Sequence, residues 1–194
     1  MLTVYIDFKS PAAYLAMQPT LSLAERLGLT VDWRPFRAIE RDVPKIDGAE
    51  TVGERHRRVR AASQRALAVK YAAHQGIDLR FPETPGSTDL ALGAMLGIDG
   101  DKTAFLQAAF AAYWTDHEVL DDEATVARIL AETGTDYRGH LNEAPAHLDL
   151  AQAKSEEAGI VGTPAYVIEE QIFVGREHLP WIAEIASERT AEAT

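Results

Sequence analysis

Ser10 stands between a short apolar segment and a helical pattern, where one side chain can act on a bound anion. Residues 3–8 are β-branched or aromatic for the most part and predict a strand. Ser10 is a favourable N-cap and Pro11 a favourable first helical residue, so a helix is expected to begin there. The unpaired N–H groups and the dipole of that helix start would stabilise a thiolate. Helix capping alone is the plainer alternative, because Ser before Pro commonly opens a helix.

A second feature, Gly162-Thr163-Pro164, precedes a predicted hairpin far along the chain. An X-Pro bond is cis in only ~5% of cases in folded proteins, and an ordinary trans turn is the alternative. The position at the hairpin entry, in a chain that opens with Ser10-Pro11, favours a cis bond beside Ser10. The backbone of Thr163 would then be unpaired and would face the helix start, where it can pair with an extended, peptide-like ligand.

The order of the predicted elements indicates an α/β fold with a helical insertion. A strand at residues 3–8, a helix closed by Gly28 and a strand at residues 29–36 form a βαβ start with a right-handed crossover. A β-hairpin around Glu169-Glu170 and a helix at residues 177–189 form the end. Between them lie only helical patterns, at residues 54–75, 87–96, 101–114, 121–133 and 146–158. We therefore expect a core of residues 1–50 and 160–194 and a helical insertion at residues 51–159.

The amino-acid composition disfavours several classes of function. The chain has 194 residues, no cysteine and a formal charge of −11, so it can neither form nor exchange a disulfide, and a nucleic-acid partner is disfavoured. No apolar run reaches the ~20 residues of a membrane span, and the N-terminus shows no export signal, so a cytoplasmic location is expected. The six histidines lack paired metal-ligand spacing, so no metal is expected. A basic run from Arg55 to Lys70 could face an anion, although a solvated face is the favoured interpretation.

Four segments in this order resemble the 2-hydroxychromene-2-carboxylate isomerases, relatives of the kappa-class glutathione transferases in the DsbA-like thioredoxin superfamily. They are DFKSPAAYLA at 7–16, DWRPF at 32–36, GIVGTP at 159–164 and FVGREHL at 173–179. The resemblance extends over essentially the whole chain and implies a thioredoxin-like fold, βαβ…ββα, with an all-helical insertion. It also implies glutathione as cofactor and a small-molecule substrate, and it leaves a homodimer open. Because the chain has no cysteine, we expect no disulfide reductase or oxidase activity of its own despite the resemblance.

By this resemblance, Ser10 would hold the glutathione sulfur and act in catalysis, with Pro11 and Pro164 beside it. Thr163 would pair its backbone with the cysteinyl unit. The γ-glutamyl end would bind at Arg176-Glu177, where the family often has Ser or Asn followed by Asp, and Lys45 would be a further anion contact. The favoured activity is isomerisation of an unsaturated, aromatic carboxylate such as 2-hydroxychromene-2-carboxylate. A glutathione transferase and a non-enzymatic binding protein are the alternatives.

Overall fold

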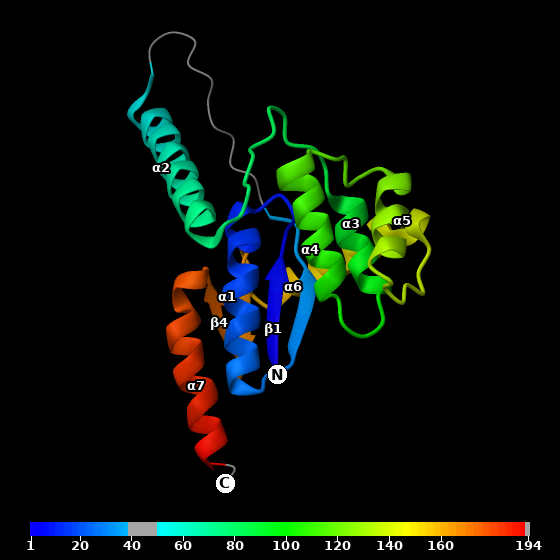
Figure 1. The fold of residues 1–194 in the computed structure, drawn as a ribbon. Coiled ribbons are helices and arrows are strands. Elements are labelled where there is room, and N and C mark those ends of the chain that lie inside the picture. Colours follow the sequence, from blue (N-terminus) through cyan, green and yellow to red (C-terminus); the bar gives the residue numbers. More distant parts are fainter. Residues whose placement is uncertain (39–49, 193–194) are drawn as a thin grey trace. The chain divides into compact units, whose positions relative to one another are not determined.

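The computed structural model describes residues 1–38 and 50–192 (Figure 1). The chain divides into two compact units, Met1–Ala38 with Arg80–Thr194, and Ile39–Leu79. The first unit opens with β1 (Leu2–Ile6), α1 (Pro11–Leu27) and β2 (Val31–Pro35), and it ends with β3 (Ala165–Ile168), β4 (Gln171–Val174), η4 (Arg176–His178) and α7 (Leu179–Glu192). Its helical middle holds α3 (Asp89–Ala94), η1 (Met95–Gly97), α4 (Thr103–Ala111), η2 (Ala112–Asp116), α5 (Glu123–Glu132), η3 (Leu141–Glu143) and α6 (Ala144–Glu157).

The four strands form one mixed sheet in the order β2-β1-β3-β4. β1 runs parallel to β2 and antiparallel to β3, which places Val4 beside both Trp33 and Tyr166. Tyr5 lies beside Arg34 in the same register, and because successive residues of a strand point to opposite faces, this pair lies on the other face of the sheet. The mixed sheet with its helices confirms the predicted thioredoxin-like α/β fold.

The hairpin that closes the sheet turns at the two predicted residues. Glu169 and Glu170 have φ values of 50° and 64°, and β3 and β4 pair directly on either side of them. A two-residue turn with both φ angles positive matches the twist of the flanking strands, which is why it holds this register although neither residue is glycine. The turn places residue 164, immediately before β3, opposite residue 175, immediately after β4.

Helix α1 covers the face of the sheet that carries Val4 and Tyr166. The Thr20 hydroxyl lies 3.1 Å from the Tyr166 hydroxyl, and the apolar side chains Leu15 and Met17 are buried. Gly28, with a φ of 62°, ends the helix in the left-handed conformation, as predicted. Helix α7 lies beside α1 (Figure 1).

The helices after residue 80 belong to the same compact unit as the sheet, which differs from the predicted division at residues 51–159. Helix α6 and η1 pack on β2, and α3 packs on α6. The apolar residues Leu92, Phe105 and Phe110 are fully buried among these elements. The predicted division followed the change from strand patterns to helix patterns along the sequence. In the structure, the apolar faces of these helices are buried against the sheet and against one another, so the helices and the sheet form one compact unit.

Helix α2 (Val52–Gln75) belongs to the second compact unit. Thr51 accepts a hydrogen bond from Glu54 N at 3.3 Å, and the Glu54 carboxylate accepts one from Thr51 N at 2.8 Å, so the helix begins with a capping box. In the basic run, Arg58 and Arg55 form ion pairs with Glu50, at 2.9 and 3.4 Å. No helix among residues 1–38 and 50–192 is both long and apolar enough to cross a bilayer.

Candidate functional site

Ser10 lies at the start of α1, immediately after the loop that follows β1. Its extended backbone (φ −85°, ψ 108°) makes it the N-cap, and its hydroxyl oxygen accepts a hydrogen bond from Ala13 N at 3.2 Å. The Ser10 carbonyl accepts from Tyr14 N at 3.1 Å. Among the described residues nothing accepts the Ala12 N–H. An anion beside Ser10 would therefore meet a hydroxyl, an unused N–H and the positive end of the helix dipole.

Thr163 and Pro164 lie directly beside Ser10, and the bond between them is cis, as the sequence predicts. The Ser10 hydroxyl donates a 3.4 Å hydrogen bond to the Thr163 carbonyl. The expectation that the Thr163 backbone is unpaired is therefore wrong for its carbonyl, because the capping hydroxyl still has a proton to donate. The Thr163 N–H has no acceptor among residues 1–38 and 50–192, and its hydroxyl oxygen is buried without a partner in that part of the chain.

The turn after β4 joins this site through Pro164. Gly175 N donates a 2.8 Å hydrogen bond to the Pro164 carbonyl, with Gly175 at a φ of 105°. The exposed Glu177 carboxylate folds over Gly175, so that a Cβ added there would meet a Glu177 oxygen at 2.3 Å. A side chain at position 175 would be strained by its φ, whereas the flexible Glu177 side chain could move aside to make room for it.

Arg176 has a structural contact that the sequence analysis does not predict. Pro19 lies inside α1 and has no N–H, so the Leu15 carbonyl one turn earlier lacks its helical partner. The Arg176 guanidinium donates a 3.3 Å hydrogen bond to that carbonyl. The structure therefore brings Ser10, Thr163 and the turn at 175–177 together around the start of α1, with Arg176 bound to α1 itself. Lys45 lies outside the described residues.

Comparison with known protein families shows to which family the chain belongs. The family described as DSBA-like thioredoxin domain matches residues 1–185. The chain belongs to the DSBA-like thioredoxin domain family. Two curated relatives, both named 2-hydroxychromene-2-carboxylate isomerase, come from Sphingobium xenophagum and Pseudomonas putida. The first is 26% identical over 92% of this chain and 93% of its own length. The second is 27% identical over 90% and 88%.

Solved structures confirm the fold of this DSBA-like domain. A selenomethionine form of 2-hydroxychromene-2-carboxylate isomerase aligns with a TM-score of 0.78 at 19% identity, covering 100% of this chain and 98% of its own. The cytosolic disulfide reductase DsbM from Pseudomonas aeruginosa, solved with GSH, aligns with a TM-score of 0.58 at 18% identity, covering 99% and 98%. Because the two solved structures are only 19% and 18% identical to this chain, they show a shared fold and not a shared function.

Asp7 holds the loop of this DSBA-like domain that carries Ser10. Its side chain is fully buried, and its two oxygens accept hydrogen bonds from Lys9 N (2.9 Å), the Thr88 hydroxyl (3.1 Å) and Ala38 N (2.8 Å). Three separate segments are thereby tied to one carboxylate. Burial raises the pKa of Asp7, and the hydrogen bonds offset part of that rise. The sequence analysis quotes this residue within a motif but assigns it no role, although an acid between Ile6 and Phe8, beside an apolar strand, is a usable signal.

Trp114 holds the same loop from the other side. Its Nε1 donates a 2.8 Å hydrogen bond to the Phe8 carbonyl, and its own carbonyl accepts from Arg80 N at 2.8 Å. Trp114 lies in η2, a π-helical turn that follows α4. Nothing in the local sequence predicts this turn, because the contact that it serves spans 106 residues.

Tyr166 is the ionisable group beneath α1. Burial raises the pKa of Tyr166 to about 12, while the hydrogen bond with Thr20 lowers it. A phenol in this state keeps its proton at neutral pH and cannot act as a base. Among the described residues no cluster of three or more His, Asp or Glu side chains could hold a metal ion.

The raised pKa of Asp7 predicts a pH-dependent stability. Because the folded pKa lies above the unfolded value of 3.8, the contribution of protonated Asp7 is fully present below that value and is lost as pH rises through the folded pKa. The loss amounts to about 1.4 kcal/mol for each pKa unit of difference. The free energy of unfolding of the wild type, relative to Asp7→Asn, is therefore expected to fall over this range in urea titrations.

Asp122→Asn is the matched control for this titration. Asp122 caps α5, and the hydrogen bonds that it accepts from Thr125 lower its pKa. The free energy of unfolding of the wild type, relative to Asp122→Asn, is therefore expected to rise with pH. If the free energy of unfolding of the wild type, relative to Asp7→Asn, stayed constant or rose with pH, burial would not penalise ionisation of Asp7 as predicted.

Proposed function

We propose that this protein is a glutathione-dependent isomerase acting on an unsaturated, aromatic carboxylate such as 2-hydroxychromene-2-carboxylate. The observation that carries the proposal is the Ser10 hydroxyl at the start of α1, 3.4 Å from the Thr163 carbonyl, in a chain without cysteine. A site of this kind stabilises a thiolate that it does not itself contain. Two relatives that match about nine-tenths of the chain carry the isomerase name, which supports this reaction.

The donors around Ser10 fit a thiol cofactor. The Ser10 hydroxyl can leave the Thr163 carbonyl and donate to a sulfur anion, because its 3.4 Å bond is long and weak. The Ala12 N–H and the helix dipole add to the stabilisation and lower the pKa of a bound thiol. Bound glutathione would supply a thiolate that adds reversibly to a conjugated carbon and leaves unchanged.

The remaining predicted residues would position the tripeptide. The Thr163 N–H, which has no acceptor in the described part of the chain, would pair with the cysteinyl backbone, as an added strand does, with Pro11 and Pro164 beside it. Arg176 and Glu177 would bind the γ-glutamyl end, which carries both an ammonium and a carboxylate. Lys45 would be a further anion contact. With no cysteine to form a dithiol, we propose no disulfide oxidoreductase activity for this chain.

Glutathione is expected to stabilise the folded protein. At about 100 times its dissociation constant, a ligand that binds only the native state adds about 2.7 kcal/mol, which raises the melting temperature by about 5–10 °C in a chain of this size. Thr163→Pro removes the N–H and should weaken the shift, whereas the matched control Thr163→Ala keeps the N–H and should retain most of it. S-methylglutathione, which has no thiol to ionise, should shift the melting temperature less.

Turnover then separates the candidate reactions. Conversion of 2-hydroxychromene-2-carboxylate is followed by absorbance with and without glutathione, and the thiol is counted at the end. The isomerase proposal expects conversion that requires glutathione and leaves its amount unchanged. Stoichiometric loss of the thiol would point to the transferase, and no melting shift up to about tens of millimolar glutathione would overturn glutathione binding.

A further inference from the structure

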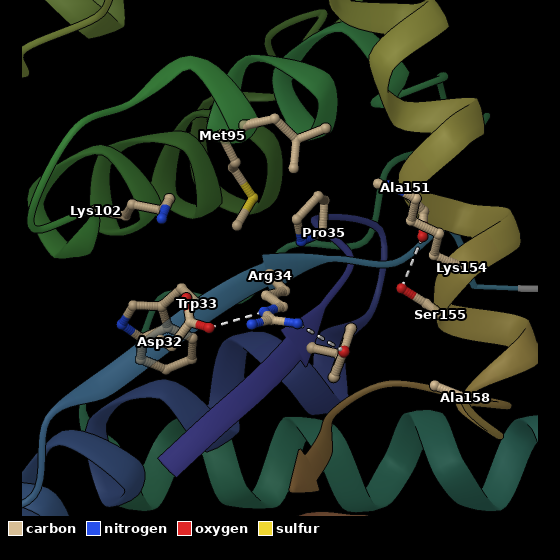
Figure 2. Close-up of a pocket in the computed structure, with 12 residues that line it drawn as sticks. Asp32, Trp33, Arg34, Pro35, Met95, Lys102, Ala151, Lys154, Ser155 and Ala158 are labelled. Atoms are coloured by element: carbon tan, nitrogen blue, oxygen red, sulfur yellow. Dashed lines mark hydrogen bonds and ion pairs between the residues drawn. The ribbon is translucent and has the colours of Figure 1, made fainter. Parts of the chain in front are cut away.

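A cavity of about 360 Å³ lies on the face of the sheet opposite to α1 (Figure 2). Tyr5 and Arg34 line it, and their register places them on the face that α1 does not cover. Helix α6 forms one wall, and η1 with the residue before α4 forms another. The lining contains neither Ser10 nor Thr163. The cavity is therefore distinct from the site at the start of α1, and its size is that of a small-molecule pocket.

The lining is cationic although the chain as a whole is acidic. Lys102 and Lys154 lie on opposite walls, and neither has an ion-pair partner in the described part of the chain (Figure 2). The third cation, Arg34, donates to Asp32 at 2.7 Å, and within residues 1–38 and 50–192 Asp32 is the one acid that lines the cavity. Two positive charges are thus uncompensated here, in a protein of formal charge −11. A local excess of this kind attracts anions.

Tyr5 adds a buried donor to the two lysines. Only 5% of its surface is exposed, and its hydroxyl oxygen accepts a 3.5 Å hydrogen bond from Arg34. Its own proton has no acceptor among residues 1–38 and 50–192. The other walls are largely apolar and include the buried side chain of Met95. The cavity therefore offers donors for an anionic group and a hydrophobic surface for a hydrocarbon body.

We propose that this cavity binds a small organic carboxylate, independently of the site at Ser10. The carboxylate lies between Lys102 and Lys154 and accepts the Tyr5 proton, and the hydrocarbon body packs against Met95. Hydrogen bonds from charged donors to a carboxylate are stronger than neutral ones, which favours an anion over its neutral amide. The apolar walls favour an organic acid over an inorganic anion, which would leave them in contact with water.

Methionine NMR tests this placement directly. The chain has three methionines, Met1, Met17 and Met95, of which Met95 lines the cavity and Met17 lies in α1. In protein labelled with ¹³C at the methionine methyl groups, 2-naphthoate is expected to shift the Met95 signal, assigned with Met95→Leu, and to leave Met17 in place. Glutathione should not move Met95. If Met95 stays unshifted by about 10 mM 2-naphthoate, the proposal is wrong.

Affinity measurements test the chemistry. By isothermal titration, 2-naphthamide and inorganic phosphate should each bind at least about tenfold more weakly than 2-naphthoate, because each lacks one of the two features. Lys102→Met and Lys154→Met should each weaken 2-naphthoate about tenfold, whereas the control Lys70→Met on α2 should not change it. Equal affinities for acid and amide, or unchanged affinity in both cavity variants, would show that the lysines are only solvated surface groups.

The NMR test and the titrations are both independent of the isomerase proposal.

Discussion

Replacing Ser10 by alanine is expected to lower the rate of isomerisation about 10- to 1,000-fold, with most glutathione affinity retained. The hydroxyl is the side-chain donor at the start of α1, and it is the group proposed to face the cofactor's sulfur. Its removal leaves the Thr163 N–H, the Ala12 N–H and the turn at residues 175–177 in place. The effect should therefore appear in kcat more than in glutathione binding. The measurement is steady-state kinetics together with glutathione titration of both proteins.

Loss of a helix cap must be separated from loss of chemistry in this experiment. Ser10→Ala also removes the hydrogen bond from Ala13 N, which costs about 0.5–2 kcal/mol of stability. Asp122→Ala removes the equivalent bond at α5, where the carboxylate accepts from Thr125 N at 2.9 Å, far along the chain from the proposed site. That variant should lose similar stability and keep the wild-type rate. If Ser10→Ala also keeps the wild-type rate, Ser10 is only a helix cap.

Replacing Gly93 by alanine is expected to destabilise the protein by about 3 kcal/mol and to lower its melting temperature by about 6–12 °C. Gly93 is buried in α3, where this helix packs on the start of α6. A Cβ at this position would lie 2.2 Å from the Ala144 carbonyl oxygen. That atom belongs to the backbone, so it can move only if α6 moves with it.

Gly53→Ala is the matched control, because Gly53 is also helical but a Cβ there would meet only the flexible Arg57 side chain, at 3.7 Å. It should change the free energy of unfolding by less than about 1 kcal/mol. Thermal and urea unfolding measure both variants. A Gly93→Ala protein as stable as the control would mean that α3 and α6 can separate without cost. Thr88 immediately precedes α3, and its hydroxyl donates to Asp7, so a displacement of α3 should also weaken the glutathione-induced shift in melting temperature.

The sequence predicted the elements of this fold well because their signals are local. Ser10 and Pro11 begin α1 and Gly28 ends it, as their capping and left-handed preferences require. The apolar runs on either side of Glu169-Glu170 pair as β3 and β4. The helical patterns at residues 101–114 and 121–133 correspond to α4 with η2 and to α5. Each of these predictions depends on residues within a few positions of one another.

The proximity of Ser10 to Thr163-Pro164 was predicted for the same reason. Ser10, Thr163 and Pro164 could be proposed together because each stands at the end of a strongly patterned element. The Asp7 hydrogen bonds could not be predicted, since their donors, Lys9, Ala38 and Thr88, come from three segments with no common pattern.

By itself the sequence determined that the chain has no thiol of its own, the order of strands and helices, and the residue that begins α1. Tertiary packing alone decided that the Ser10 hydroxyl donates to Thr163 and that Arg176 binds the carbonyl released by Pro19. It also decided that Lys102 and Lys154 share one cavity. The reason is physical: caps, turns and periodicity act over one or two helical turns, whereas these contacts join residues 52 to 161 positions apart, which only the packed sheet and helices bring together.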